Sequence, residues 1–493
     1  MQSVPFVSLV IFLSSPCLSA FVVGCFAVPI KPSEEKKMSK KIVCLGAGSG
    51  YFRRALADLA VTEGIAGSEI TLYDLDYEKC EIMAKHGMRL AKESGTGLTV
   101  RACKELADAV DGANFAISSI GGSGASIGGV YSTSLHVQDM IIPARYGIYQ
   151  IIGDTTGPAG MMMGLRSIPA YISICREMEK RCPEVVLMSH SNPMAPLCRA
   201  MTKYTGIKVI GICHGVQGGI SNVAGVLGVS PHELDTIWIG TNHYYWFTRI
   251  RSKSGEDLYP EFWRRIAQRG PVDGQIMTTK LSQIYGYQIT YPPDDHVFEF
   301  YSFPAQVPDG KSIPYGLLEH VHGTRYEELE IKAEPERTDA ENQEIRRKQL
   351  EEYEKGLGGL KLPDGPSDPL IGEGLGKLIE DITLGRRQVH IVNIPNKGAI
   401  PNLPDHAIME IDGVTDSCGV RGVYMDEAPL YLKGLLEKRI AWQELVADAA
   451  VKGDRNLALQ ALLLDEMAIP PEKSEAMLDE LLAASGEMLP QFD

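Results

Sequence analysis

Apolar, β-branched runs alternate with longer amphipathic segments between about residues 40 and 212. Strands are expected at Lys41–Leu45, Ser68–Leu72, Thr99–Arg101, Phe115–Ile120, Val185–Met188 and Lys208–Ile212, and helices at Arg53–Thr62, Glu78–Ser94 and Ser167–Arg181. Strands that alternate with helices are typical of a parallel sheet, and nearly continuous apolar strands indicate that helices cover both of its faces. The expected fold class is therefore α/β, with a Rossmann-like, doubly wound parallel sheet.

Gly121–Gly160 interrupts this alternation with a glycine-rich stretch that contains Gly153-Asp154-Thr155-Thr156-Gly157-Pro158. Long loops at the carboxyl ends of the strands in such sheets bind ligands. We therefore expect this stretch to be a ligand-binding loop.

The pattern changes after about Trp246. Residues 252–310 are mixed and aromatic, residues 325–355 are highly charged and predict an exposed helix, and Gly356–Asp368 predicts a mobile loop. Arg387–Ile411 returns to strands, and Ala428–Ala484 is mostly helical. The chain is expected to divide into an extension over residues 1–37, a sheet domain over residues 38–215 and an α+β domain over residues 216–493.

Composition and charge limit the classes of function. With 493 residues the chain is long enough for two packed domains, and its apolar content of 44% is ordinary for a globular protein. The formal charge is −15, and there is no dense Lys/Arg cluster, so a nucleic-acid partner is not expected. The ten cysteines include no C-x-x-C pair, which predicts reduced thiols rather than a disulfide framework.

The N-terminal segment allows two interpretations. Residues 4–30 carry no charge and are long enough for a membrane span or a signal sequence. No Lys or Arg precedes them, however, and Met38 stands directly before the first strand, so residues 1–37 fit an upstream extension of the reading frame. We expect a cytoplasmic protein without stable membrane association; export or anchoring through residues 4–30 is the alternative.

A dinucleotide fingerprint follows the first predicted strand. It comprises Gly46, Gly48, Ser49, Gly50 and Tyr51, with Asp74 at the end of the second strand. Glycines between a strand and a helix let backbone N–H groups approach a pyrophosphate, and an acidic residue at the next strand favours NAD over NADP. Tyr51 replaces the usual third glycine, and a simple glycine turn is the alternative.

Cys213 and His243 each follow an apolar run and are the metal candidates. A thiolate and an imidazole suit a borderline divalent ion, with oxygen atoms of substrate or water completing the shell. A buried thiol and a core histidine are the alternative interpretation.

These segments, taken in order, resemble the NAD- and metal-dependent glycoside hydrolases of family 4. The matching segments are Gly46–Tyr51, Tyr73–Asp76, Pro143–Gly147, Gly153–Pro158, Ser191–Met194, Cys213–Val216, Thr241–His243, Asp294–Glu299, Pro395–Gly398 and Asn402–Pro404. The resemblance implies a lactate/malate dehydrogenase-like architecture, NAD and Mn²⁺ as cofactors, and a carbohydrate substrate. A homodimer or homotetramer is also expected.

The resemblance further implies a redox route to hydrolysis. NAD⁺ takes hydride from sugar C3, a base removes the C2 proton while the metal stabilises the negative charge, the C1–O bond eliminates, water adds, and hydride returns. Cys213 and His243 would hold the metal. His214 would protonate the leaving group. The base would be Tyr285 or Tyr287, with Tyr291 and Tyr301 as competitors.

Other matched residues imply contacts to the sugar and its class. Substrate-binding candidates are Asn192, Arg145, Asp154, His296 and Asn396; Asp294, Asp295 and His296 could equally form a surface turn. Cys213-His214-Gly215-Val216 resembles members that act on unphosphorylated α-galactosides or α-uronides, and flanking segments resemble α-galacturonidases, although those usually carry Glu at the position of Gly215. An α-galacturonide is expected, and an α-galactoside is the alternative.

Two functions from other classes compete. A 2-hydroxyacid dehydrogenase shares the nucleotide fold but has no use for Cys213 and His243. A non-enzymatic NAD sensor would have no reason to keep these residues and Asn192.

Overall fold

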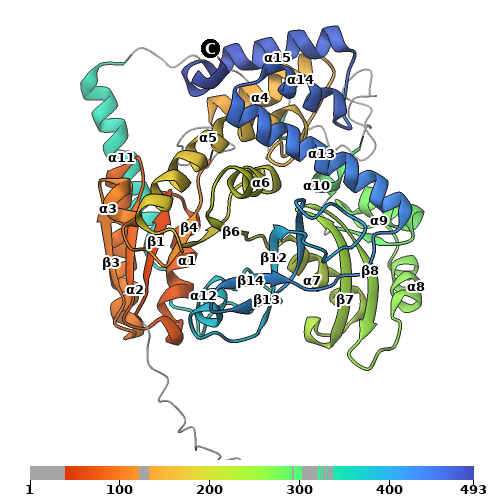
Figure 1. Ribbon diagram of the computed structural model, residues 1–493, viewed down its shortest axis with the longest axis horizontal. Coiled ribbons are helices and arrows are strands. Elements are labelled where there is room, and N and C mark those ends of the chain that lie inside the picture. Colours follow the sequence, from red (N-terminus) through yellow and green to blue (C-terminus); the bar gives the residue numbers. More distant parts are fainter. Residues whose placement is uncertain are drawn as a thin grey trace, which may run out of the picture. The chain divides into compact units, whose positions relative to one another are not determined.

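The central sheet of the protein has nine strands in the order β14-β13-β12-β6-β5-β4-β1-β2-β3 (Figure 1). The computed structural model describes residues 39–121, 133–290, 294–301, 320–321, 324–325, 329 and 337–492. These residues form one compact unit.

Six strands form the parallel part of this sheet. They are β1 (Lys41–Leu45), β2 (Glu69–Tyr73), β3 (Thr99–Cys103), β4 (Phe115–Ser118), β5 (Val186–Ser189) and β6 (Lys208–Gly211). All six lie where the apolar runs predicted strands. Successive residues of β1 enter different cores: Ile42 and Cys44 face one cluster, whereas Val43 and Leu45 face the other. This alternation confirms the predicted α/β fold with helices on both faces.

Two layers of helices cover the sheet. The core on one side includes α1 (Tyr51–Ala60), α2 (Tyr77–Ser94) and α12 (Leu375–Thr383). The core on the other side includes α3 (Leu106–Val110), α5 (Gly157–Arg181) and α6 (Met194–Tyr204). The long helix α13 (Leu430–Lys452) packs on α5 and α6, and α14 (Arg455–Leu464) and α15 (Pro471–Ser485) follow it (Figure 1).

The sheet continues past residue 215, where a domain boundary was expected. β12 (Val389–Pro395) pairs antiparallel with β6 through Asn393 and Gly211, and β13 (Ile408–Asp416) and β14 (Gly419–Gly422) extend the edge. The C-terminal part of the chain therefore completes the sheet that the N-terminal part begins.

A separate antiparallel sheet contains β7 (Leu234–Thr241), β8 (Tyr244–Ser252) and β9 (Gln288–Ile289). Helix α7 (Gly215–Leu227) precedes this sheet in the sequence. Helices α8 (Tyr259–Arg269) and α9 (Ile276–Tyr285) lie between β8 and β9, and α10 (Asp294–Phe298) follows β9. β10 (His320–Val321) and β11 (Thr324–Arg325) form a short pair, and α11 (Asp339–Leu357) is the exposed charged helix that the sequence predicted.

The glycine-rich stretch, which was expected to be a ligand-binding loop, contains two helical segments. Helix α4 (Ser134–Arg145) begins after Thr133, whose hydroxyl accepts a hydrogen bond from the backbone N–H of His136. Helix α5 begins at Gly157, ten residues before the predicted start, and every residue from Gly157 to Ile168 is buried. A helix that is buried on all sides lacks the polar face by which an amphipathic pattern is recognised, so this part of α5 was missed.

The described cysteines carry free thiols, and all of them except Cys418 are buried. Among the described residues, no helix is both long enough and apolar enough to cross a membrane. The segment of residues 4–30, for which export or anchoring was considered, lies outside the described residues.

Candidate active site

Cys213 and His243 meet in the folded protein. Cys213 follows β6, and His243 lies in the tight turn between β7 and β8, with its Nε2 atom 3.5 Å from the Cys213 sulfur. Both residues are buried. His243 has a φ of 62°, an uncommon backbone conformation for a residue other than glycine. The turn therefore holds this imidazole against the thiol, so the two predicted metal ligands lie side by side.

A chain of hydrogen bonds fixes the orientation of the His243 ring. The Thr155 hydroxyl donates to the Asp154 carboxylate at 2.6 Å and lies 3.0 Å from Nδ1 of His243. Because its proton goes to Asp154, this hydroxyl accepts from Nδ1–H. In that tautomer of a neutral ring, Nε2 carries the lone pair and faces the Cys213 sulfur. This is the orientation that a metal-binding histidine needs.

Asn192 joins the same network. Its side-chain amide donates to Asp154 at 2.8 Å, and Asp154 is buried. Three segments far apart in sequence therefore converge here: the loop of residues 153–158, the Asn192 turn after β5, and the Cys213 and His243 pair.

The surroundings of Cys213 disfavour a bare thiolate. Burial raises the pKa of this thiol well above its usual value, and the nearby carboxylate of Glu410 raises it further. A thiolate in such surroundings needs a positive charge beside it. The donor set of thiol, imidazole and neighbouring oxygens therefore fits a borderline divalent metal.

Glu410 was not recognised from the sequence. It lies on β13 and is fully buried, and burial raises its pKa to about 7 despite a hydrogen bond from Asn393. The signal was present in the sequence, because Glu410 stands between the apolar residues Met409 and Ile411.

A second cluster contains His190, His214 and Glu373. Glu373 Oε1 lies 2.6 Å from Nε2 of His190 and 3.5 Å from Nδ1 of His214. Although burial opposes ionisation of Glu373, hydrogen bonds from the two imidazoles lower its pKa to about 2. Of these three residues only His214 lies in a matching sequence motif; His190 and Glu373 lie outside all of them.

The predicted dinucleotide loop is a tight turn between β1 and α1. Gly46 has a φ of +74°, and a Cβ atom there would come within 2.3 Å of the Ser119 carbonyl oxygen, so only glycine fits. The Asp74 carboxylate accepts from the backbone N–H groups of Gly48, at 2.8 Å, and Asp76, at 2.7 Å. Each carboxylate oxygen has a second lone pair, which remains able to accept from a ribose hydroxyl.

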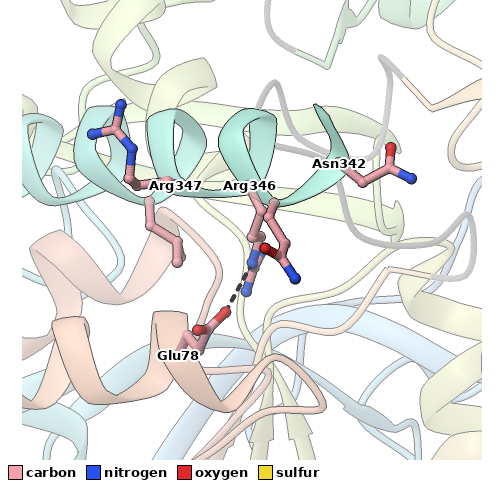
Figure 2. Close-up of a pocket in the computed structure, with 6 residues that line it drawn as sticks. Glu78, Asn342, Arg346 and Arg347 are labelled. Atoms are coloured by element: carbon pink, nitrogen blue, oxygen red, sulfur yellow. Dashed lines mark hydrogen bonds and ion pairs between the residues drawn. The ribbon is translucent and has the colours of Figure 1, made fainter. Parts of the chain in front are cut away.

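A surface hollow of about 470 Å³ lies near this loop, between α2 and α11 (Figure 2). Arg346 on α11 pairs with Asp76 and, at 2.9 Å, with Glu78 on α2. These contacts attach α11 beside the strand end that carries Asp74. The hollow is lined by Glu78, Asn342, Gln343, Arg346, Arg347 and Leu350, and contains none of the predicted site residues.

Several predicted site residues lie elsewhere or serve the framework. Arg145 is about half exposed and pairs with Glu480 at 3.3 Å. Asn396 is buried and bonds the backbone of Ile400 and Leu403, which holds the loop between β12 and β13. Asp294 is buried, not exposed on a surface turn, and accepts from the backbone N–H groups of Met277 and Thr278 in the first turn of α9. The side chain of His296 lies outside the described residues.

The candidate tyrosines differ in their surroundings. Tyr285 packs against Trp246, three residues beyond His243, with ring centroids 6.1 Å apart. Tyr287 contacts Tyr259 and Tyr431, and Tyr301 is a buried phenol whose pKa burial raises strongly. Tyr291 lies outside the described residues. Two candidates therefore pack against the start of β8, directly after His243: Tyr285 against Trp246, and Tyr301 against Tyr244 with ring centroids 6.5 Å apart.

Two family models match the chain in order. The model of the family 4 glycosyl hydrolases matches residues 41–229, and the model of the C-terminal domain of this family matches residues 238–468. The chain belongs to glycosyl hydrolase family 4. This membership places it among enzymes that hydrolyse glycosides and decides against a 2-hydroxyacid dehydrogenase.

Curated relatives cover almost the whole chain. The alpha-galactosidase of Bacillus subtilis (strain 168) is 29% identical over 460 residues, which is 92% of this chain and 100% of the relative. The alpha-galacturonidase of the same organism is 28% identical over 473 residues, 90% of this chain and 96% of the relative.

Solved structures share the fold. A putative glucosidase, lplD, from Bacillus subtilis is 27% identical, with a TM-score of 0.70 over 90% of this chain and 100% of that one. A 6-phospho-alpha-glucosidase from gut microorganisms, solved in complex with NAD and Mn²⁺, has a TM-score of 0.69 over 92% of this chain and 100% of that one. Its identity is 21%, and it supports the fold alone.

Proposed function

We propose that this family 4 glycosyl hydrolase cleaves an unphosphorylated α-glycoside, preferably an α-galacturonide, with NAD and Mn²⁺ as cofactors. The observation that carries the proposal is the Cys213 and His243 pair, whose imidazole is oriented through Thr155 for a metal. The glycine loop before α1 supports a dinucleotide. When bound, NAD would supply reversible oxidation at sugar C3, and Mn²⁺ would supply the charge that favours loss of the C2 proton.

The residues of the chain would divide the remaining work. Cys213 and His243 would hold the metal, and Asn192 and Asp154 would hold sugar hydroxyls beside it. Tyr285 is the preferred base for the C2 proton. It packs on Trp246, close in sequence to His243, whereas burial strongly raises the pKa of Tyr301, the other candidate beside this turn. His214, directly after the metal cysteine and more than half exposed, would donate a proton to the leaving group.

The substrate class rests on Cys213-His214-Gly215-Val216, which differs from the pattern of members that act on phosphosugars. Arg145, considered as a partner for a uronate carboxylate, pairs with Glu480 at the surface instead. Among the described residues of the two clusters, the side chains able to carry positive charge are the imidazoles. An acidic sugar would therefore be recognised by histidine or by hydrogen-bond donors rather than by this arginine.

An α-galactoside is the second candidate, supported by the 29% identity to an alpha-galactosidase over 92% of this chain. Kinetics measured side by side on the nitrophenyl α-galacturonide, α-glucuronide, α-galactoside and 6-phospho-α-glucoside, with NAD⁺, Mn²⁺ and a reductant, decide between them. We expect the highest kcat/KM with the galacturonide. Preference for the galactoside would contradict only the uronide, whereas preference for the phosphorylated sugar would contradict the whole substrate class.

A further inference from the structure

Three metal-ligating side chains converge outside the Cys213 and His243 pair. His190 directly follows β5, His214 lies just beyond β6, and Glu373 stands two residues before α12. One ligand atom from each lies within 4.8 Å of the other two. The carboxyl ends of parallel strands meet at one edge of a sheet, which brings His190 and His214 together, and the segment before α12 adds Glu373.

The backbone and a neighbouring ring hold this cluster in place. The Tyr51 ring stacks on His190 with centroids 4.0 Å apart, and the His190 backbone N–H donates to Ser118 at 2.8 Å. Glu373 precedes Gly374, which has a φ of +60° and packs so closely on Pro369 that a Cβ atom would lie 2.7 Å from its Cα. The ligand atoms are therefore positioned before any ligand arrives, which lowers the entropic cost of binding.

The donor set is that of a cation site. Two imidazoles and one carboxylate are ligands that zinc, cobalt and related divalent ions accept, with water in the open positions. The net charge of the set with neutral imidazoles is −1, which favours a cation. We propose that His190, His214 and Glu373 bind a second divalent cation of this borderline class, separate from the metal at Cys213.

This site goes beyond the proposed function, which uses one metal and gives His214 the role of proton donor. The two roles use different ring nitrogens: Nδ1 of His214, 3.5 Å from Glu373 Oε1, would bind the cation, and Nε2–H would donate the proton. The second site differs chemically from the first because it contains no sulfur. That difference makes the two sites distinguishable with cobalt: a thiolate ligand gives Co²⁺ a charge-transfer band, whereas nitrogen and oxygen ligands give only d–d bands. Binding is measured without substrate, so the result does not depend on which sugar the enzyme cleaves.

The test is a Co²⁺ titration of metal-free, full-length protein in a background with Cys17→Ser, Cys25→Ser and Cys418→Ser. Cys418 is an exposed thiol, and Cys17 and Cys25 lie outside the described residues. We expect two equivalents to bind, one with the charge-transfer band and one without it. Glu373→Gln and His190→Phe should each weaken the second equivalent by about tenfold or more while the charge-transfer band remains. Phenylalanine keeps a flat ring to stack on Tyr51. Cys213→Ser should remove the band and keep the other equivalent.

A matched control is His232→Ala. His232 is an exposed imidazole that pairs with Asp368 at 2.9 Å and is not one of the three clustered ligands. Its loss should leave both equivalents in place. Wild-type protein that binds only the equivalent with the charge-transfer band overturns the second site, as does retention of two equivalents with unchanged affinity in either Glu373→Gln or His190→Phe.

Discussion

Thr155 decides which nitrogen of His243 faces Cys213. Its hydroxyl has one proton, which goes to Asp154, so it can only accept from the imidazole. Through this one hydroxyl, the Gly153–Pro158 loop sets the orientation of the His243 ring toward Cys213. The roles proposed for Cys213, His243 and Tyr285 each depend on a few contacts of one side chain, so replacing that side chain tests each role.

Cys213→Ser and His243→Ala should each reduce Mn²⁺-dependent turnover by roughly 10²-fold or more, since both remove a ligand of the ion that stabilises developing charge. NAD⁺ affinity, measured by fluorescence, should stay close to that of the wild type, because the glycine loop is a separate element. Wild-type turnover in either variant would place the metal elsewhere.

Tyr285→Phe should lower kcat by roughly 10²- to 10⁴-fold, the range expected for loss of a general base. Tyr287→Phe is the matched control, because Tyr287 contacts Tyr259 and Tyr431 rather than Trp246. Exchange of the C2 proton with solvent deuterium should disappear only in Tyr285→Phe. The opposite ranking of the two variants would assign the base to Tyr287.

Among the elements, the loop that carries Asp154 is held from both ends. Glu299 lies next to α10 and accepts from the backbone N–H groups of Ile151, Ile152 and Gly153 at 2.6–3.0 Å. Asp465, just beyond α14, accepts from the Gly157 N–H at 3.2 Å. Helices distant in sequence thus position the loop that orients His243.

Glu299 should also make stability depend on pH. Burial raises its pKa from 4.5 to about 7 despite the backbone hydrogen bonds, so the folded protein favours the neutral carboxyl. The resulting contribution to stability is complete below about pH 4.5 and is lost as the pH rises through 7.

Glu299→Gln cannot ionise and should escape that loss. Its Tm relative to the wild type should therefore be higher at pH 8 than at pH 5, by a few degrees, which a thermal shift assay can measure. Glu480→Gln removes an exposed carboxyl as the control and should show no such difference. An equal Tm offset at both pH values for Glu299→Gln would exclude this linkage.

At the scale of the whole molecule, the sheet unites the two halves of the chain. β12–β14 come from the C-terminal part, and Asn393 on β12 pairs with Gly211 on β6 just before Cys213. The candidate metal pair thus lies where both halves meet. The homodimer or homotetramer expected from the sequence stays a prediction, which sedimentation velocity can decide.

Activity should need both cofactors, because hydride transfer and charge stabilisation are separate requirements. Protein that has been dialysed against a chelator should be inactive and recover with Mn²⁺ only when NAD⁺ is also present. The measurement is release of nitrophenol from the preferred glycoside. Full activity without either addition would contradict a redox route.

The sequence by itself determined the parallel sheet and the family. Strand periodicity is local, and the glycine loop, the Asn192 turn, Cys213 and His243 are short motifs whose order can be followed along the chain. The conformation of His243 and the early start of α5 were not apparent, because the first depends on a turn geometry and the second on complete burial.

Only the tertiary structure decided which residues share a site. Glu373 lies beside His214, and Glu410 lies near Cys213, because α12 and the sheet edge place them there. They are about 160 and 200 residues from Cys213 along the chain, and no local pattern encodes that approach. Arg145 and Asn396 both belong to matching motifs. Arg145 nevertheless pairs with Glu480 at the surface, and Asn396 holds the loop between β12 and β13. Residue type and order are properties of the chain, whereas proximity and burial are properties of the fold.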